Sequence, residues 1–373
     1  MKTKKRVAAI ITEYWDISHA DVIITKMLEG FNLDGYTYTS TLEIASMYID
    51  KFPDNDIGRE LAAKHQVPLY AAIAEALKCG GDTFELDGII LIGEHGDYPE
   101  NERRQILYPR RAFFEACLNV MIEAGRFVPV YTDKGYAILE EDIKWMYEQI
   151  KKYNIPFMSS SVIPYCKQTF DVQPQPAGAP ITKMFGFSYD GPGEAPERYM
   201  YHSLEMLQSV AEYRAGGESG IARVRAIEGK EAVKQALETK WHPLYMKLGS
   251  FLNFPDMDQL ADKQIHPYLL EIDYSDGLEA GIFFADQIVW DFGVVVQLDE
   301  HSEPRCRGFW PQPGKPYSHF GTLVLEIEKF IHTGRPPFPV ERSYLTTGTL
   351  ASFIEALYEK REVETPHLQQ VIY

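Results

Sequence analysis

The sequence lacks any apolar run of about 18 residues or more, which a membrane-spanning helix would need. Its basic N-terminus leads into an apolar stretch at residues 7–11 that is too short for a secretory signal peptide. The few cysteines have no C-x-x-C spacing, which argues against a zinc knuckle or a disulfide framework: Cys79, Cys117, Cys166 and Cys306. These absences predict a reduced, cytoplasmic protein without a membrane anchor.

Basic residues are fewer than acidic residues. Lys and Arg together number 37 against 54 Asp and Glu, which gives a formal net charge of −17. Such a surface repels a polyanion, so nucleic acid is not expected as a partner. With 373 residues, 45% of them hydrophobic, the chain can bury enough apolar surface for two domains.

The first part of the chain alternates short apolar strands with segments of helical periodicity. A strand at residues 6–11 precedes a helix at 18–28, for which Ser18 is the expected N-cap. The stretch at 86–93 is almost continuously apolar, which is typical of a strand buried on both faces. This alternation predicts right-handed βαβ units and therefore a Rossmann-like, doubly wound parallel sheet over residues 1–160.

The second part of the chain, residues 161–373, has longer strands after a proline-rich loop at 173–180. The expected strands lie at residues 182–189, 221–227, 267–274, 279–285 and 289–298, and a Gly-containing turn joins the third and fourth as a hairpin. One helix, at 195–213, lies among them, and two helices close the chain and could pack back on the first domain. This pattern predicts an α+β domain with an open, mainly antiparallel sheet.

An open sheet of this size needs one face covered, because an exposed sheet would be an adhesive apolar patch. The helix at 195–213 can cover only one side of the sheet. We therefore expect a homo-oligomer, a dimer or a tetramer, that pairs the open faces through residues 182–189 and 289–298.

In open α/β sheets, ligands bind at the carboxyl ends of the strands. The segment after the first strand contains Thr12, Glu13, Ser18 and His19 but no glycine, so the G-x-G-x-x-G loop of ordinary dinucleotide sites is missing. The N–H groups at a helix start can still bind a phosphate, although the charge of Glu13 opposes it. Asp50 ends the second strand, where an acid either binds an adenosine ribose or caps the turn that follows.

Gly93, Glu94, His95 and Asp97 follow the most apolar strand. Glu94, His95 and Asp97 could together hold a divalent metal, but a turn with solvated polar side chains is the favoured interpretation. Further along, four arginines and a tyrosine lie within residues 103–111. They would suit a carboxylate or phosphate ligand, and surface ion pairing is the favoured alternative.

Asp133 and Lys134 follow the fifth strand of the first domain. A lysine at such a βα turn can act as an acid–base group or polarise a hydroxyl group. His202 lies on the helix of the second domain, where a lone histidine is more often structural than catalytic. The wider sequence pattern makes both residues stronger candidates for a catalytic role.

That pattern resembles the Gfo/Idh/MocA oxidoreductases, the family of glucose–fructose oxidoreductase and inositol dehydrogenase, over most of the chain. Residues 122–134 are similar to the family segment that leads into a Glu-Lys-Pro motif, with Asp133 in place of Glu and Lys134 as its lysine. His19, Asp50 and His202 match family positions, and residues 330–337 resemble the start of the closing helices.

The resemblance implies a hydride transfer between NAD or NADP and a hydroxyl of a sugar, cyclitol or related small polar substrate. Lys134 and His202 would be catalytic, and the implied cofactor-binding residues are Thr12, Glu13, Ser18, His19, Asp50, Gly93, Glu94, His95 and Asp133. Two alternatives stay open. One is a redox-neutral or metal-assisted lyase, isomerase or hydrolase that has lost dinucleotide binding, and the other is a non-catalytic binding subunit.

Overall fold

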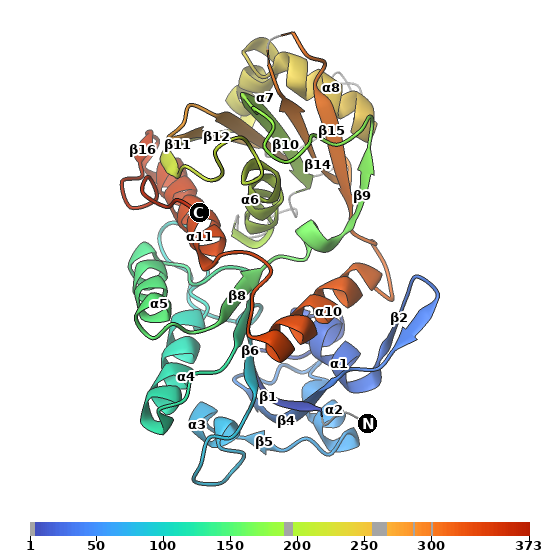
Figure 1. Cartoon of the computed structure of the whole chain (residues 1–373), viewed down its shortest axis with the longest axis vertical. Coiled ribbons are helices and arrows are strands. Elements are labelled where there is room, and N and C mark those ends of the chain that lie inside the picture. Colours follow the sequence, from blue (N-terminus) through green and yellow to red (C-terminus); the bar gives the residue numbers. More distant parts are fainter. Residues whose placement is uncertain (1–3, 190–196, 256–266, 286–287, 300) are drawn as a thin grey trace. The chain divides into compact units, whose positions relative to one another are not determined.

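The computed structural model describes residues 4–189, 197–255, 267–285, 288–299 and 301–373 (Figure 1). The chain forms two compact units, and each draws on separate stretches of sequence. The first unit comprises Met1–Glu100, Ile106–Val162 and Gly314–Tyr344. The second unit comprises Asn101–Gln105, Ile163–Pro313 and Leu345–Tyr373.

The first unit is built on a six-stranded parallel sheet with the order β5-β4-β1-β6-β7-β8. Its strands are β1 (Lys5–Ile11), β4 (Leu42–Ile49), β5 (Leu69–Tyr70), β6 (Gly88–Ile92), β7 (Val130–Asp133) and β8 (Phe157–Ser160). Both β4 and β6 run parallel to β1, and every residue of β6 is buried. The prediction of a Rossmann-like parallel sheet is therefore confirmed.

Helices follow these strands as the alternating pattern predicts. They are α1 (Lys26–Glu29), α2 (Gly58–Lys64), α3 (Ile73–Leu77), α4 (Arg110–Ala124), α5 (Glu140–Lys152) and, from late in the sequence, α10 (Ser318–Thr333). A π-helical stretch, Asp21–Thr25, precedes α1, and a small hairpin of β2 (Phe31–Leu33) and β3 (Tyr36–Tyr38) follows it. The Asp21 N–H donates to Ser18 Oγ at 3.2 Å, which confirms Ser18 as the cap of this helical segment.

The second unit contains a sheet of eight strands in the part of the chain that the structure describes, with the order β16-β11-β12-β13-β10-β14-β15-β9. These are β9 (Lys167–Phe170), β10 (Lys183–Tyr189), β11 (Ile221–Glu228), β12 (Tyr268–Tyr274), β13 (Glu279–Ala285), β14 (Phe292–Gln297), β15 (Arg305–Trp310) and β16 (Val363–Glu364). Neighbouring strands are antiparallel except β10 and β13, so the predicted mainly antiparallel sheet is confirmed.

Both faces of this sheet are covered within the chain. Gly186 of β10 faces Met206 and Leu207 of α6 (Glu197–Ala211). The opposite face packs on α7 (Gly229–Glu238) and α8 (His242–Leu252) in one buried apolar cluster, to which the sheet contributes Phe185, Phe187 and Val295 and the helices Ala232, Ala236, Leu244 and Leu248.

The expectation of an open face was therefore wrong. It overlooked α7 and α8, whose apolar residues recur at helical spacing at Ala232, Val233, Ala236 and Leu237. Residues 184–189 are all buried without a second copy of the chain, so they are not free to pair two sheets. A homo-oligomer stays a prediction, but we no longer expect these strands to form its interface.

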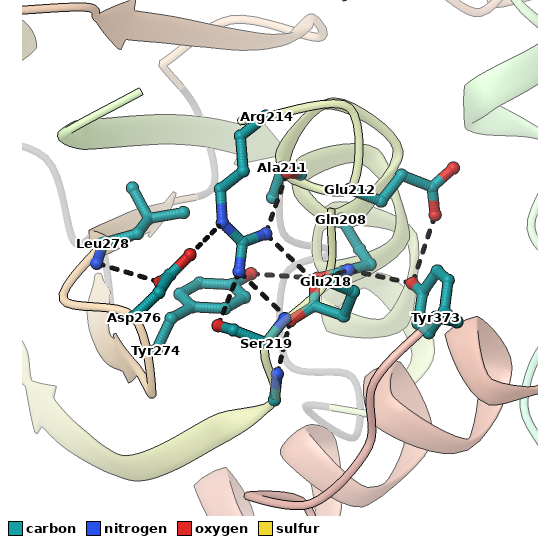
Figure 2. A network of polar contacts seen from close by, with 11 residues as sticks. Gln208, Ala211, Glu212, Arg214, Glu218, Ser219, Tyr274, Asp276, Leu278 and Tyr373 are labelled. Atoms are coloured by element: carbon teal, nitrogen blue, oxygen red, sulfur yellow. Dashed lines mark hydrogen bonds and ion pairs between the residues drawn. The ribbon is translucent and has the colours of Figure 1, made fainter. Parts of the chain in front are cut away.

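A buried polar network ties three segments of the second unit together (Figure 2). The Arg214 guanidinium, after α6, donates to Glu218 at 3.2 Å and to Asp276 in the β12–β13 turn at 2.7 Å. Gln208 of α6 donates both to Glu218 and to the Tyr373 hydroxyl at the end of the chain. Burial alone would lower the pKa of Arg214, but the two carboxylates outweigh it and raise that pKa. Arg214 is thus a charged crosslink.

Replacing Arg214 by methionine should destabilise the second unit. The change leaves the buried Glu218 carboxylate without its main cation, and breaking a buried pair this way lowers the free energy of unfolding by about 3–5 kcal/mol. Arg361→Met, which removes an exposed ion pair with Glu355, is the matched control and should cost less than about 1 kcal/mol. Denaturant unfolding measures both, and equal losses would contradict a central role for Arg214.

Candidate functional site

The first unit brings the predicted site residues to one edge of its sheet. Thr12 follows β1, Asp50 follows β4, Glu94 follows β6, and Asp133 and Lys134 lie at the end of β7. Backbone hydrogen bonds hold these ends in register, from Asp50 N–H to the Ile11 carbonyl at 2.9 Å and from Lys134 N–H to the Ser160 carbonyl at 3.1 Å. This is the edge at which open α/β sheets bind ligands.

Glu94 is the centre of a buried charge cluster. Its side chain is 1% exposed, and its Oε1 lies 2.6 Å from Lys134 Nζ. Its Oε2 lies 2.5 Å from Arg110 Nη2, and the same guanidinium donates from Nε to the Gly93 carbonyl at 2.8 Å. Thr12 Oγ1 donates to the Glu94 carbonyl at 2.6 Å. One carboxylate therefore holds two cations from two other elements.

The cluster fixes the charge of Glu94. Burial alone would raise the pKa of its carboxyl, but the charges of Lys134 and Arg110 outweigh burial and hold that pKa well below its ordinary value. Lys134 itself is only 4% exposed. The pair therefore presents a fixed ammonium at the end of β7, and not a lysine in bulk solvent.

The backbone bends sharply at both ends of this ion pair. His95, next to Glu94, has a φ of 70° and Lys134 a φ of 61°, in the left-handed region that non-glycine residues rarely adopt. A Cβ at Gly93 would lie 2.6 Å from Arg110 Cγ, so only glycine lets Arg110 cross this strand end. Such local strain clusters at functional sites.

His19 and Asp133 form a second pair at the same edge. His19 Nδ1 lies 2.6 Å from Asp133 Oδ2, and the Asp133 side chain is 1% exposed. The Tyr131 hydroxyl donates to the other Asp133 oxygen at 3.4 Å. The ring of His19 meets the rings of His95 and Phe320 edge-on. The structure thus brings together three of the predicted cofactor-binding residues.

Asp50 is held by two tyrosines. The Tyr48 hydroxyl donates to Oδ1 at 2.5 Å and the Tyr98 hydroxyl to Oδ2 at 2.7 Å. Burial, together with the hydrogen bond to Asp50, raises the pKa of Tyr48 to about 12, so this hydroxyl stays a donor. The carboxylate of Asp50 is therefore oriented at the end of β4.

Several N–H groups in and next to the loop after β1 are bonded within this segment. The N–H groups of Trp15 and Asp21 donate to Ser18 Oγ, each at 3.2 Å. The Ile17 N–H donates to Asp21 Oδ2 at 3.0 Å, and the Ser18 N–H to the Trp15 carbonyl at 2.9 Å. Glu13, also predicted for the cofactor, accepts from Trp15 Nε1 at 3.2 Å.

These contacts decide how the edge could hold a dinucleotide. Asp50 fits the ribose, because each carboxylate oxygen has a second lone pair beside the tyrosine bond. The loop offers no glycine-lined cradle, since the N–H groups of Trp15, Ile17, Ser18 and Asp21 are bonded internally. The phosphates of a dinucleotide would have to bind other groups of the protein.

The metal alternative is not supported. Within the described residues, no three His, Cys, Asp or Glu side chains are arranged to hold a metal ion. Glu94, His95 and Asp97 fail as a ligand set because the Glu94 carboxylate is already bound by Lys134 and Arg110.

The arginines of residues 103–111 divide between two kinds of contact. Arg110 belongs to the Glu94 cluster, and Arg111 pairs with Glu115 and lies 3.4 Å from the centre of the Trp145 ring. Arg103 lies 4.0 Å from Glu355 within the second unit. The favoured interpretation, ion pairing, holds for these three, although Arg110 pairs in the interior.

His202, the second predicted catalytic residue, lies on α6 of the second unit and is 8% exposed. Its ring packs edge-on against Tyr199 and Phe292. Tyr189 adjoins the same cluster through Tyr199, and its ring stacks on the exposed Trp290 at 3.9 Å.

Sequence reasoning missed Arg110 and Tyr98 as parts of the site. Arg110 stood in the arginine-rich segment, but its partner Glu94 lies 16 residues earlier. Tyr98 belongs to the polar segment after β6, and its partner Asp50 lies 48 residues away. The available signal for Tyr98 was its place in the segment that follows β6, at the carboxyl edge of the parallel sheet.

Comparison with known proteins identifies the fold. No protein-family model and no curated protein sequence matches the chain. Among solved structures, scyllo-inositol dehydrogenase from Lactobacillus casei is similar with a TM-score of 0.57 and 12% identity over 98% of this chain and 99% of that one. GenD2 from gentamicin A biosynthesis, in complex with NAD, gives 0.57 and 11% over 98% of both chains. An aldose-aldose oxidoreductase from Caulobacter crescentus gives 0.52 and 13% over 97% and 100%.

These similarities extend over nearly the whole of each chain. The chain has the two-domain fold of the Gfo/Idh/MocA-type dehydrogenases, and the resemblance seen in the sequence is confirmed at the level of the fold. No described helix is both long and apolar enough to span a bilayer.

Replacing Glu94 by glutamine should make the first unit less stable and change its acid sensitivity. At neutral pH the variant removes the carboxylate that pairs with two buried cations, which should lower the free energy of unfolding by about 3–5 kcal/mol. Because folding depresses the pKa of Glu94, its contribution is present above its ordinary value of 4.5 and is lost as the pH falls toward the depressed value.

Unfolding curves measured between neutral and acidic pH test this expectation. The wild type should lose this stability below about pH 4.5, whereas Glu94→Gln should lack that part of the acid dependence. Glu43→Gln, at an exposed ion pair with Arg6, is the matched control. Parallel curves for wild type and Glu94→Gln would contradict the assignment.

Proposed function

We propose that this protein is an oxidoreductase that transfers hydride between NAD or NADP and a hydroxyl group of a sugar, cyclitol or related small polar substrate. The observation that carries the proposal is the buried Lys134 ammonium at the carboxyl end of β7, held at 2.6 Å by Glu94. Its position matches the lysine of the Gfo/Idh/MocA motif. Solved neighbours with the same fold are named as inositol and aldose oxidoreductases, and one was solved with NAD.

In this function the nicotinamide ring supplies the hydride acceptor or donor. Lys134 and His202 are the proposed groups at the substrate hydroxyl. A charged lysine has three N–H donors, so Lys134 can keep Glu94 and also bind a substrate oxygen. That bond would stabilise the negative charge that develops on the oxygen during oxidation.

Asp50 is the proposed partner of the cofactor ribose, because its carboxylate is oriented by Tyr48 and Tyr98. Glu13 and His95 are proposed to line the cofactor at the same edge. Thr12, Ser18, Gly93 and Glu94 would act by shaping the edge, since their polar groups or backbone hold its loops. None of the four cysteines forms a disulfide bond, in keeping with the proposed cytoplasmic location.

Cofactor binding tests the proposal directly. Isothermal titration should detect binding of one cofactor pair, either NAD⁺ and NADH or NADP⁺ and NADPH. Asp50→Ala should weaken that binding at least tenfold, about 1.4 kcal/mol, because the ribose loses a charged acceptor. Asp54→Ala, at an exposed turn position nearby, should bind as the wild type does. Binding of neither cofactor pair would contradict the proposed function.

Lys134→Met tests the proposed proton chemistry. The variant should fold, because Glu94 keeps Arg110 as a partner. Its turnover in cofactor reduction, screened over cyclitols and aldoses, should fall by about 10²–10⁴-fold, the usual contribution of a positioned acid or base. Lys144→Met, on the exposed side of α5, is the control. Wild-type turnover in Lys134→Met would show that Lys134 is structural.

A further inference from the structure

A line of aromatic side chains lies at one end of the sheet of the second unit. Tyr189 ends β10 and Phe292 begins β14, and the antiparallel pairing of these strands places Ser188 opposite Phe292. Tyr199 and His202 lie in the first two turns of α6. The ring centres of Tyr189 and Tyr199 are 5.4 Å apart, and those of Tyr199 and His202 are 6.2 Å apart. The His202 ring in turn lies 6.4 Å from that of Phe292, so the proposed catalytic imidazole is part of this line.

Trp290 is the exposed member of the same aromatic line. Its indole stacks on Tyr189, with ring centres 3.9 Å apart and ring planes inclined by 18°. Because Tyr189 covers one face of the indole and 64% of Trp290 is exposed, the exposed part is the opposite face and the edge. The stack also restricts the orientation of the indole. A ligand that packs on the open face would therefore cost little side-chain freedom.

The open face of the indole suits a ring whose own face consists of C–H groups. The face of an aromatic ring carries negative charge density, which attracts weakly positive C–H hydrogens, and the contact removes apolar area from water. Pyranoses and cyclitols with mostly equatorial hydroxyl groups present such a face. A flexible acyclic polyol has to be ordered before it can present one, which costs conformational entropy. Trp290 therefore favours cyclic polyols over acyclic ones.

A carboxyl group directly follows the indole in the sequence. Asp291 stands between Trp290 and Phe292, and its side chain is half-buried. Burial raises the pKa of Asp291, and no cation among the described residues offsets this effect. A half-buried carboxyl gains from a hydrogen-bond donor, and the hydroxyl groups of a polyol are such donors, whereas an apolar protein surface offers none. A polyhydroxylated ring is thus a better occupant of this place than an apolar surface.

We infer that Trp290 is the platform on which the substrate ring stacks, and that it selects cyclic over acyclic polyols. This inference rests on the proposed function for its substrate class. Trp290 acts by binding and orienting the ring and takes no part in the transfer of hydride or proton. Because stacking contributes equally before and during the reaction, it should act on KM and leave kcat nearly unchanged.

The first arm of the test measures polyol binding by saturation-transfer NMR, with reduced cofactor present so that no alcohol is oxidised. The wild type should bind scyllo-inositol, myo-inositol or D-glucose more tightly than the acyclic D-mannitol. Trp290→Ala should weaken this binding about tenfold, about 1.4 kcal/mol, whereas Trp290→Phe should keep most of it because the smaller ring still stacks. Tyr36→Ala removes a 71%-exposed ring from β3 of the first unit and is the control, which should bind as the wild type does.

The second arm measures KM and kcat for the polyol that binds, with the oxidised cofactor. Trp290→Ala should raise KM about tenfold and keep kcat within about twofold of the wild type. Its denaturant midpoint should equal that of the wild type, because the indole is largely exposed. A change in its molecular mass by light scattering would instead assign Trp290 to an interface between copies of the chain and overturn the inference.

The remaining outcomes separate the inference from the proposed function. Equal binding of a ring by wild type and Trp290→Ala, binding of D-mannitol as tight as that of the rings, or binding of none of the three rings overturns the inference alone. A wild type that binds neither cofactor pair overturns the proposed function. Ring binding that still depends on Trp290 in such a protein would support the platform without the redox chemistry.

Discussion

The burial of one charged carboxylate, Glu94, is the constraint on which the strand edge of the first unit depends. A buried carboxylate is tolerated only when it is paired and hydrogen-bonded, because desolvation of a lone charge costs several kcal/mol. Lys134 and Arg110 meet this need from β7 and α4, two elements that are far apart in the sequence. Much of the local geometry follows, including the missing side chain at Gly93 and the left-handed backbone at Lys134.

This constraint also separates two neighbouring residues into two chemical roles. Asp133 and Lys134 are consecutive, yet Asp133 binds His19 and Lys134 binds Glu94. The sharp backbone bend at Lys134 ends β7 there and lets its side chain leave the alternation of the strand. The edge therefore holds a lysine that is ion-paired with Glu94 and an imidazole that is hydrogen-bonded to Asp133.

The sequence predicted the elements better than it predicted their partners. The apolar stretch at 86–93 identified the buried strand β6, and the strand ends placed Glu94, Asp50 and Lys134 at a single edge. Which carboxylate meets which cation depends on side chains 16, 40 and 114 residues apart, and periodicity carries no such information. The covered sheet of the second unit was missed because only one helix, at residues 195–213, was predicted among these strands, and α7 and α8 were not.

The loop after β1 lacks the glycine-rich turn of ordinary dinucleotide sites. Glycines in such a turn leave backbone N–H groups open to a phosphate. Here Ser18 and Asp21 accept from the N–H groups of Trp15, Ile17 and Asp21, so these groups are bonded before any ligand arrives. Contacts between side chains instead hold the carboxyl edge of the sheet in place: Asp50 with its tyrosines, His19 with Asp133, and Glu94 with its cations. The proposed recognition at this edge therefore depends on charged and aromatic side chains more than on the backbone.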